Sequence, residues 1–100
     1  MSRAKATRPR ILRAAGNEAT GRFISVALSL YASLSRFAPV SGQPMAVEVE
    51  EGLTLGELLQ AFRVPLEEVK LVFINHRATV LERVLAEGDR VGAFPPVAGG

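Results

Sequence analysis

A single segment of this chain has the pattern of an α-helix, and it lies among segments that have the pattern of β-strands. Thr54 and Glu57 form a capping box at its start, because each side chain can accept a hydrogen bond from the backbone amide of the other residue. Apolar residues then recur at the spacing of one helix face: Leu55, Leu58, Leu59 and Phe62. Pro65 prevents the helix from continuing. We therefore predict one helix that begins at Thr54.

Strand patterns occupy most of the remaining sequence. Residues 24–31 alternate apolar with small or polar side chains, which is typical of a strand with one buried face. Residues 69–74 are nearly all apolar, so we expect a central strand with both faces covered. Further strands are predicted at 46–50, 78–81 and 90–94, with turns at 51–52, 75–76 and 87–89. This order predicts an α+β domain with one main helix packed on one face of a sheet.

The chain has 100 residues, which is enough for one ordinary domain. Residues 1–21 contain few large apolar side chains, so we expect a flexible basic arm there and a folded domain over residues 22–100. The basic start and the apolar stretch 24–34 imitate a signal or transit peptide. Serines interrupt that stretch, and it is shorter than the roughly 20 residues that span a bilayer, so we expect a cytoplasmic protein.

Charge is unevenly distributed along the chain. The formal net charge is +2, but residues 1–22 carry +5 and residues 23–100 carry −3. The high isoelectric point therefore belongs to the arm. We expect the body of the protein to bind basic protein surfaces rather than nucleic acid.

The sequence has no pattern of catalytic or metal-binding residues. It has no cysteine, which excludes disulfides and thiolate chemistry, and its one histidine, His76, is predicted in an exposed turn. No phosphate-binding motif is present. Several carboxylates are expected on a solvated surface rather than as an acid–base pair: Glu48, Glu50, Glu51, Glu67 and Glu68. We expect no catalytic side chain of its own, no metal and no bound cofactor.

The C-terminal residues are Gly99-Gly100, preceded by the stiff segment Phe94-Pro95-Pro96. Glycine has no Cβ, so such an end can pass through a narrow channel and bring the Gly100 carboxylate into another protein's active site. The prolines hold the preceding segment extended. On these residues alone, an inert frayed tail fits equally well.

Five motifs, in their usual order, resemble the ubiquitin-like β-grasp sulfur carriers of the MoaD/ThiS family. They are Tyr31-Ala32-Ser33-Leu34, Thr54-Leu55-Gly56-Glu57-Leu58-Leu59, Phe73-Ile74-Asn75, Gly88-Asp89-Arg90-Val91 and Phe94-Pro95-Pro96-Val97-Ala98-Gly99-Gly100. The last two are the most specific. The resemblance covers residues 22–100 and implies a β-grasp fold with a mixed sheet of four to five strands.

The resemblance also implies a function. An ATP-dependent activating enzyme of the MoeB/ThiF type would adenylate Gly100, and a cysteine desulfurase or rhodanese-type donor would convert the adenylate into a thiocarboxylate. The motif Pro95-Pro96-Val97 is closer to MoaD, the non-catalytic small subunit of molybdopterin synthase, whose large subunit is MoaE. The sulfur would then serve the molybdenum or tungsten cofactor.

The implied working parts lie at the end of the chain. Gly99 and Gly100 would be the passage into a partner, and the docking candidates are Phe94, Pro95, Pro96 and Val97. Phe94 equally fits an ordinary core position. The sequence departs from the family at His76, where glycine is frequent, at Arg90, which replaces an acidic residue, and in its basic arm.

Two other functions stay open at this point. The first is a related carrier or modifier, which would supply sulfur for thiazole or another metabolite or attach Gly100 to protein lysines. The second is an interaction domain with an inert tail, whose basic arm binds RNA or an acidic surface.

Overall fold

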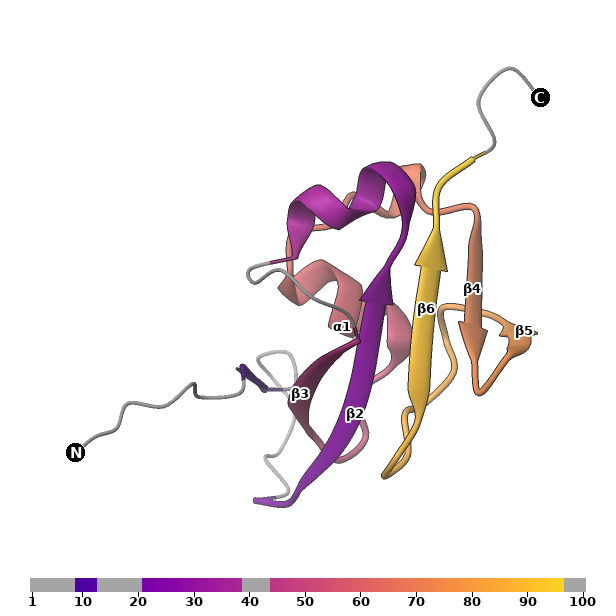
Figure 1. Ribbon diagram of the computed structural model, residues 1–100. Coiled ribbons are helices and arrows are strands. Elements are labelled where there is room, and N and C mark those ends of the chain that lie inside the picture. The colour runs from indigo at the N-terminus through magenta and orange to yellow at the C-terminus, as the bar shows by residue number, and fades with distance from the viewer. Residues whose placement is uncertain (1–8, 13–20, 39–43, 97–100) are drawn as a thin grey trace.

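The computed structural model describes residues 9–12, 21–38 and 44–96. Its framework is a six-stranded mixed sheet in the order β1-β3-β2-β6-β4-β5 (Figure 1). The strands are β1 (Arg10–Ile11), β2 (Phe23–Leu30), β3 (Met45–Glu50), β4 (Leu71–Ile74), β5 (Arg77–Thr79) and β6 (Arg90–Phe94). The helices are the α-helix α1 (Leu55–Ala61) and the 3₁₀ helices η1 (Ala32–Phe37) and η2 (Leu66–Glu68).

The two central strands, β2 and β6, run parallel, with Leu28 opposite Val91. Each has an antiparallel neighbour on its other side, β3 beside β2 and β4 beside β6. Parallel strands cannot be joined by a tight hairpin, and here the chain between them forms β3, α1, β4 and β5 (Figure 1). The predicted α+β arrangement with one α-helix is confirmed.

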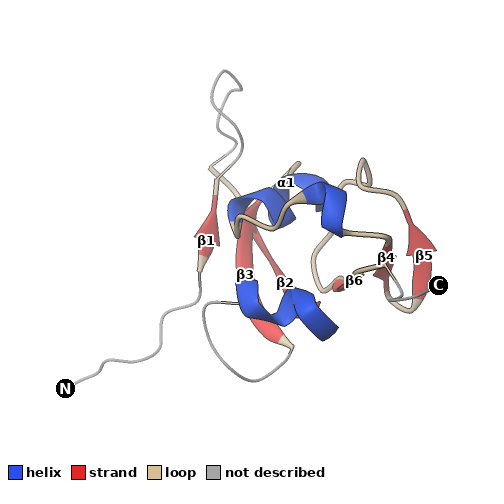
Figure 2. Ribbon diagram, turned by 90° about the horizontal axis from the view of Figure 1, so that it is seen from above, coloured by secondary structure: helices blue, strands red, loops and turns tan. Residues whose placement is uncertain are grey.

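Helix α1 begins where the sequence predicts. The Oγ1 atom of Thr54 accepts a hydrogen bond from the Glu57 amide at 3.2 Å, and the Glu57 carboxylate accepts one from the Thr54 amide at 2.9 Å. The apolar stripe of the helix is buried at Leu55, Leu58 and Leu59. Figure 2 shows α1 on one side of the sheet. Each fully buried leucine contributes about 1.5–3 kcal/mol, so this packing carries much of the stability of the domain.

The expectation that both faces of β4 are covered is wrong. Val72 and Ile74 are buried on the face of the sheet that α1 covers. On the opposite face, Leu71 is 48% exposed and Phe73 is only half-buried. A continuous apolar run shows that a strand is hydrophobic, but it does not show that a second layer packs on it. Among the described residues, α1 covers one face only, and the opposite face stays accessible. We call the face away from α1 the open face.

The sequence predicts no strand before residue 22, yet β1 pairs in parallel with β3. The Glu48 amide donates to the carbonyl of Pro9 at 2.9 Å, and Arg10 forms an ion pair with the Glu48 carboxylate at 2.9 Å. The Arg10 guanidinium also lies 4.5 Å from the centre of the Phe23 ring. The expected flexible arm therefore does not extend to residues 10–11, while residues 1–8 and 13–20 lie outside the described part.

Within the described residues, no helix combines the length and the apolar character that crossing a membrane requires.

Candidate functional site

The base of the C-terminal segment is the first candidate site. Phe94 is the last residue of β6, Pro95 is half-buried and Pro96 is exposed. The other predicted site residues, Val97, Gly99 and Gly100, lie outside the described part of the chain. The structure therefore describes three of the four docking candidates, Phe94, Pro95 and Pro96. Val97 and the predicted passage at Gly99 and Gly100 stay predictions.

Backbone hydrogen bonds hold the end of β6 on both sides. The amide of Tyr31 donates to the carbonyl of Ala93 at 3.1 Å, and the amide of Lys70 donates to the carbonyl of Phe94 at 2.8 Å. In β6 the residues alternate, so that Val91 and Ala93 are buried in the core, while Phe94 lies on the open face. The C-terminal segment thus departs from a firmly held point of the sheet.

Phe94 belongs to an aromatic cluster with Tyr31 and Phe73. The rings of Phe94 and Tyr31 are stacked, with centroids 4.3 Å apart, and Phe73 meets Phe94 edge-on at 5.6 Å. Tyr31 is 41% exposed. Phe94 is therefore half-buried on the open face and is not part of the core beneath α1.

Tyr31 was not among the predicted site residues, although it belongs to the motif Tyr31-Ala32-Ser33-Leu34, which the sequence analysis quoted for the family resemblance. Leu34 is fully buried, and its amide donates to the carbonyl of Tyr31 at 3.0 Å, which starts helix η1. Between them Ala32 has a left-handed φ of 52°. This tight turn sends Leu34 into the core and leaves the ring of Tyr31 on the open face. The motif Tyr31-Ala32-Ser33-Leu34 is thus the local device that builds the aromatic cluster.

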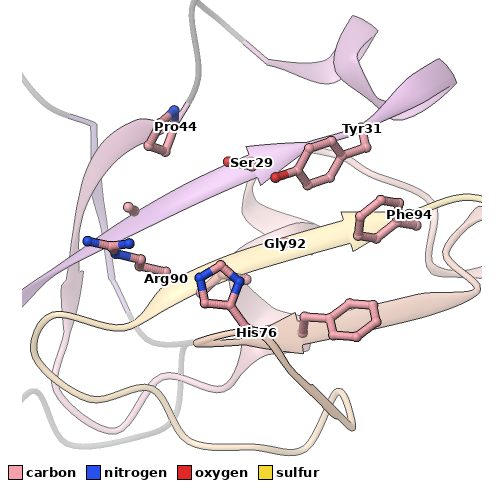
Figure 3. A pocket seen from close by; sticks show the side chains of 10 residues that line it. Ser29, Tyr31, Pro44, His76, Arg90, Gly92 and Phe94 are labelled. Atoms are coloured by element: carbon pink, nitrogen blue, oxygen red, sulfur yellow. The ribbon is translucent and has the colours of Figure 1, made fainter.

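A hollow of about 730 Å³ extends from the aromatic cluster along the open face (Figure 3). Small residues of β2 and β6, Ala27, Ser29 and Gly92, lie between its walls. A Cβ on Gly92 would meet the Tyr31 ring at 3.3 Å, so glycine leaves that ring its place. Pro44, His76 and Arg90 complete the lining.

The turn that carries His76 is fastened to the start of β6. Asn75 and His76 form the two-residue connection between β4 and β5, with φ angles of 54° and 71°, as in a type I′ turn. The Asn75 side chain donates to the Asp89 carboxylate at 3.1 Å and accepts from the Arg90 amide at 3.0 Å. His76 is exposed, which agrees with the sequence analysis.

Asp89 completes this arrangement from the interior. Asp89 is 4% exposed, and its second carboxylate oxygen accepts a hydrogen bond from the Ala86 amide at 2.8 Å. Gly88 before it has a φ of 84°, which glycine adopts without strain. Asn75 and Asp89 therefore hold His76 and Arg90 in position beside the hollow, and neither is among its described lining residues.

Most of the remaining carboxylates behave as predicted. Glu51 and Glu67 are exposed, and the carboxylates of Glu48 and Glu68 pair with arginines at the surface. Glu50 is the exception, since it is only 2% exposed at the end of β3, opposite Phe23 of β2. Among the described residues there is no cluster of three or more potential metal ligands.

Comparisons with known proteins agree with this architecture. The family model described as Mut7-C ubiquitin matches residues 23–99. The crystal structure of SAMP1 from Haloferax volcanii is 28% identical, has a TM-score of 0.53, and is matched over 76% of this chain and 99% of that chain. No curated protein sequence matches significantly.

Two further solved structures support the fold alone. The solution structure of the Haloferax volcanii HVO 2177 protein has a TM-score of 0.64 at 24% identity, covering 88% of this chain and 97% of that one. A Pyrococcus furiosus protein proposed to be molybdopterin converting factor subunit 1 has a TM-score of 0.53 at 23% identity, covering 74% and 99%. The predicted ubiquitin-like β-grasp fold is confirmed, with β1 as the strand beyond the four to five expected.

Proposed function

The chain belongs to the Mut7-C ubiquitin family, and on this premise we propose that it is a sulfur carrier that bears a thiocarboxylate on Gly100. The observation that carries the proposal is the ubiquitin-like domain whose last strand, β6, continues in the sequence through Pro95-Pro96 to Gly99-Gly100. The reactive atom would be the carbonyl carbon of Gly100. The absence of cysteine and of a described metal cluster is compatible with such chemistry, because the sulfur is carried on the backbone.

Activation would use ATP held by a separate adenylating enzyme of the MoeB/ThiF type. A carboxylate oxygen of Gly100 attacks the α-phosphorus of ATP, and pyrophosphate leaves. The acyl-adenylate that forms has AMP as a good leaving group. The carrier needs only to deliver its terminus, and glycine permits this because it has no side chain to collide with a narrow channel.

Sulfur would then come from a persulfide on a cysteine desulfurase or rhodanese-type donor. The outer sulfur attacks the Gly100 carbonyl carbon and AMP leaves, which gives an acyl disulfide. A second thiol attacks the donor cysteine's sulfur, forms a disulfide with it, and releases the thiocarboxylate. No side chain of this chain takes part in either step.

The proposed acceptor is the pterin precursor of the molybdenum or tungsten cofactor, bound by a large subunit of the MoaE type in the cytoplasm. The motif Pro95-Pro96-Val97 supports this pathway over delivery to thiazole synthesis. Docking would use the segment from Phe94 to Val97, and the partial exposure of Phe94 beside Tyr31 supports a contact there. A flat aromatic group at the centre of an interface is a frequent source of binding energy.

The experiment that tests the proposal is intact-mass measurement. The full chain is incubated with ATP, the adenylating enzyme and a persulfide donor, and exchange of one oxygen for sulfur adds about 16 Da. A variant lacking Gly99-Gly100 serves as the control. A chain whose mass does not change, under conditions where the enzyme thiocarboxylates another carrier, contradicts the proposal.

A second function is favoured by one comparison. SAMP1 of Haloferax volcanii is 28% identical to this chain, and its abbreviation stands for small archaeal modifier protein 1. We propose as the alternative that Gly100 is joined to lysine side chains of other proteins. Trypsin cleaves after Arg90, the last basic residue of the chain, so a conjugated lysine would carry the remnant of residues 91–100. Such peptides, present with the full chain and absent with the variant lacking Gly99-Gly100, would favour this function.

A further inference from the structure

The two ends of the hollow on the open face differ in chemistry. Tyr31 and Phe94 stand together at one end, whereas Arg90 and His76 lie toward the other (Figure 3). Arg90 and Phe94 are four residues apart on the same face of β6, a span of about 13 Å in a strand. A ligand that fits both ends therefore has an apolar group and a charged group at that separation.

The cationic end has no acidic counterpart of its own. No carboxylate is among the described residues that line the hollow, and Arg90 forms no ion pair with a described residue. The nearest acidic residue in sequence, Asp89, is buried and bonds to Ala86 and Asn75 instead. An exposed guanidinium with five donors and no partner is suited to a carboxylate.

Between the two ends lies a polar side chain that has no hydrogen-bond partner among the described residues. Ser29 is 9% exposed, and its hydroxyl makes no hydrogen bond to a described residue. The hydroxyl of Tyr31 points toward it along the hollow (Figure 3). Because Ser29 lines the hollow, its hydroxyl is available there to a bound segment that displaces water.

We infer that the hollow binds an acidic segment of a partner protein. The segment lays a large apolar side chain against the rings of Tyr31 and Phe94, and its carboxylate pairs with Arg90. A backbone group of the segment bonds to the Ser29 hydroxyl. This inference rests on the proposed function in that it names the chemistry of the partner that docks beside the tail.

The local charge thus reverses the expectation drawn from the whole domain. Residues 23–100 carry −3, which predicted basic partners, yet the described lining of the hollow is cationic or neutral. The small number of basic side chains in the hollow also argues for a protein partner over nucleic acid. Nucleic-acid binding depends on several charged phosphate contacts, and of the described lining residues only Arg90 and His76 carry basic side chains.

The test is a titration of the full chain, labelled with ¹⁵N, with a short extended peptide: acetyl-Gly-Phe-Thr-Val-Thr-Glu-Gly-amide. Its Phe and Glu are four residues apart and on one face, which matches the span from Phe94 to Arg90. We expect the largest shifts at the amides of Ser29, Arg90 and Gly92. Replacing the peptide's Glu by Gln should weaken binding about three- to fivefold, and replacing its Phe by Ala about fivefold or more.

Charge reversal in the protein gives the sharper result. With Arg90→Glu, the peptide that carries Lys in place of Glu should bind more tightly than the Glu peptide. Arg83→Glu makes the same charge change outside the hollow and should keep the original preference. The inference is overturned by equal affinity for the Glu and Gln peptides, by shifts confined to α1, or by tighter binding of a uridine oligonucleotide than of the Glu peptide.

A final control separates this inference from the proposed function. The variant lacking Gly99-Gly100 should bind the peptide as the full chain does, because the hollow is formed by residues before Pro95. Normal peptide binding together with no gain of sulfur would contradict the carrier proposal alone. A gain of sulfur without any preference for the acidic peptide would contradict this inference alone.

Discussion

The ring of Tyr31 lies parallel to the ring of Phe94, with centroids 4.3 Å apart and an angle of 7° between the planes. This contact joins the end of β2 to the last residue of β6. Because Phe94 immediately precedes Pro95-Pro96, the stack holds the base of the C-terminal segment against the open face. Stability and presentation of that segment are therefore linked through one aromatic pair.

The stack should be measurable as a coupling energy. Tyr31→Ala and Phe94→Ala are each expected to lower the free energy of unfolding, and the double variant should lose about 0.5–1.5 kcal/mol less than the sum of the two. Urea denaturation of the four proteins gives the cycle. Tyr31→Phe keeps the ring and should unfold close to the parent. Additive losses would mean that the two rings do not stabilise one another.

The buried Asp89 carboxylate should be a main support of the turn beneath the hollow. In Asp89→Ala, the Ala86 amide and the Asn75 side chain lose their acceptor. A hydrogen bond to a charged group contributes about 1.5–3 kcal/mol. We expect a loss of at least about 2 kcal/mol in unfolding free energy, measured by thermal or urea denaturation. Glu82→Ala, at an exposed position, is the control and should change stability by less than about 0.5 kcal/mol.

Replacing His76 with glycine should stabilise the domain. His76 has a φ of 71°, a left-handed conformation that costs a residue with a Cβ about 1–2 kcal/mol. Glycine relieves this cost but loses more entropy on folding, so we expect a net gain of about 0.5–1 kcal/mol in unfolding free energy. Ala78→Gly in the neighbouring strand β5 offers the opposite comparison and should destabilise. A loss of stability in His76→Gly would show that the imidazole makes a stabilising contact.

Adding one alanine after Gly100 should abolish adenylation without unfolding the domain. The extra residue moves the carboxylate past the reacting position, and a misplacement of that kind costs about a hundredfold or more in rate. Release of pyrophosphate reports the rate, and circular dichroism reports the fold. An alanine added before Met1 is the matched control. Adenylation at the parent rate would contradict the role given to Gly100.

Local signals predicted most of the elements, because they depend on neighbours in the sequence. Thr54 and Glu57 specify the helix start by bonding to each other's amides, and the alternation in β2 specifies its buried face. The motif at Asn75 predicted a turn, and its two positive φ angles follow from the two-residue hairpin. Such features need no knowledge of the rest of the fold.

The features that the sequence did not predict depend on distant partners. The strand β1 exists because Arg10 and Ile11 meet β3, and two residues are too few to show a period. Glu50 is buried by its place at the end of β3, opposite Phe23, although a glutamate in a charged run predicts exposure. Likewise, the hollow is assembled from β2, β6 and the turn at His76, so its combination of aromatic and cationic ends has no signature in any one segment.

The parallel pairing of β2 with β6 has a consequence for the assembly of the open face. β6 lies between β2 and β4, so a chain in which β6 has not found its place leaves both neighbours unpaired. Contacts between such distant segments form slowly, and the Tyr31–Phe94 stack is one of them. A copy in which β6 is unpaired therefore lacks the aromatic cluster on the open face. The surface on the open face is thus present only in copies whose central strands are paired.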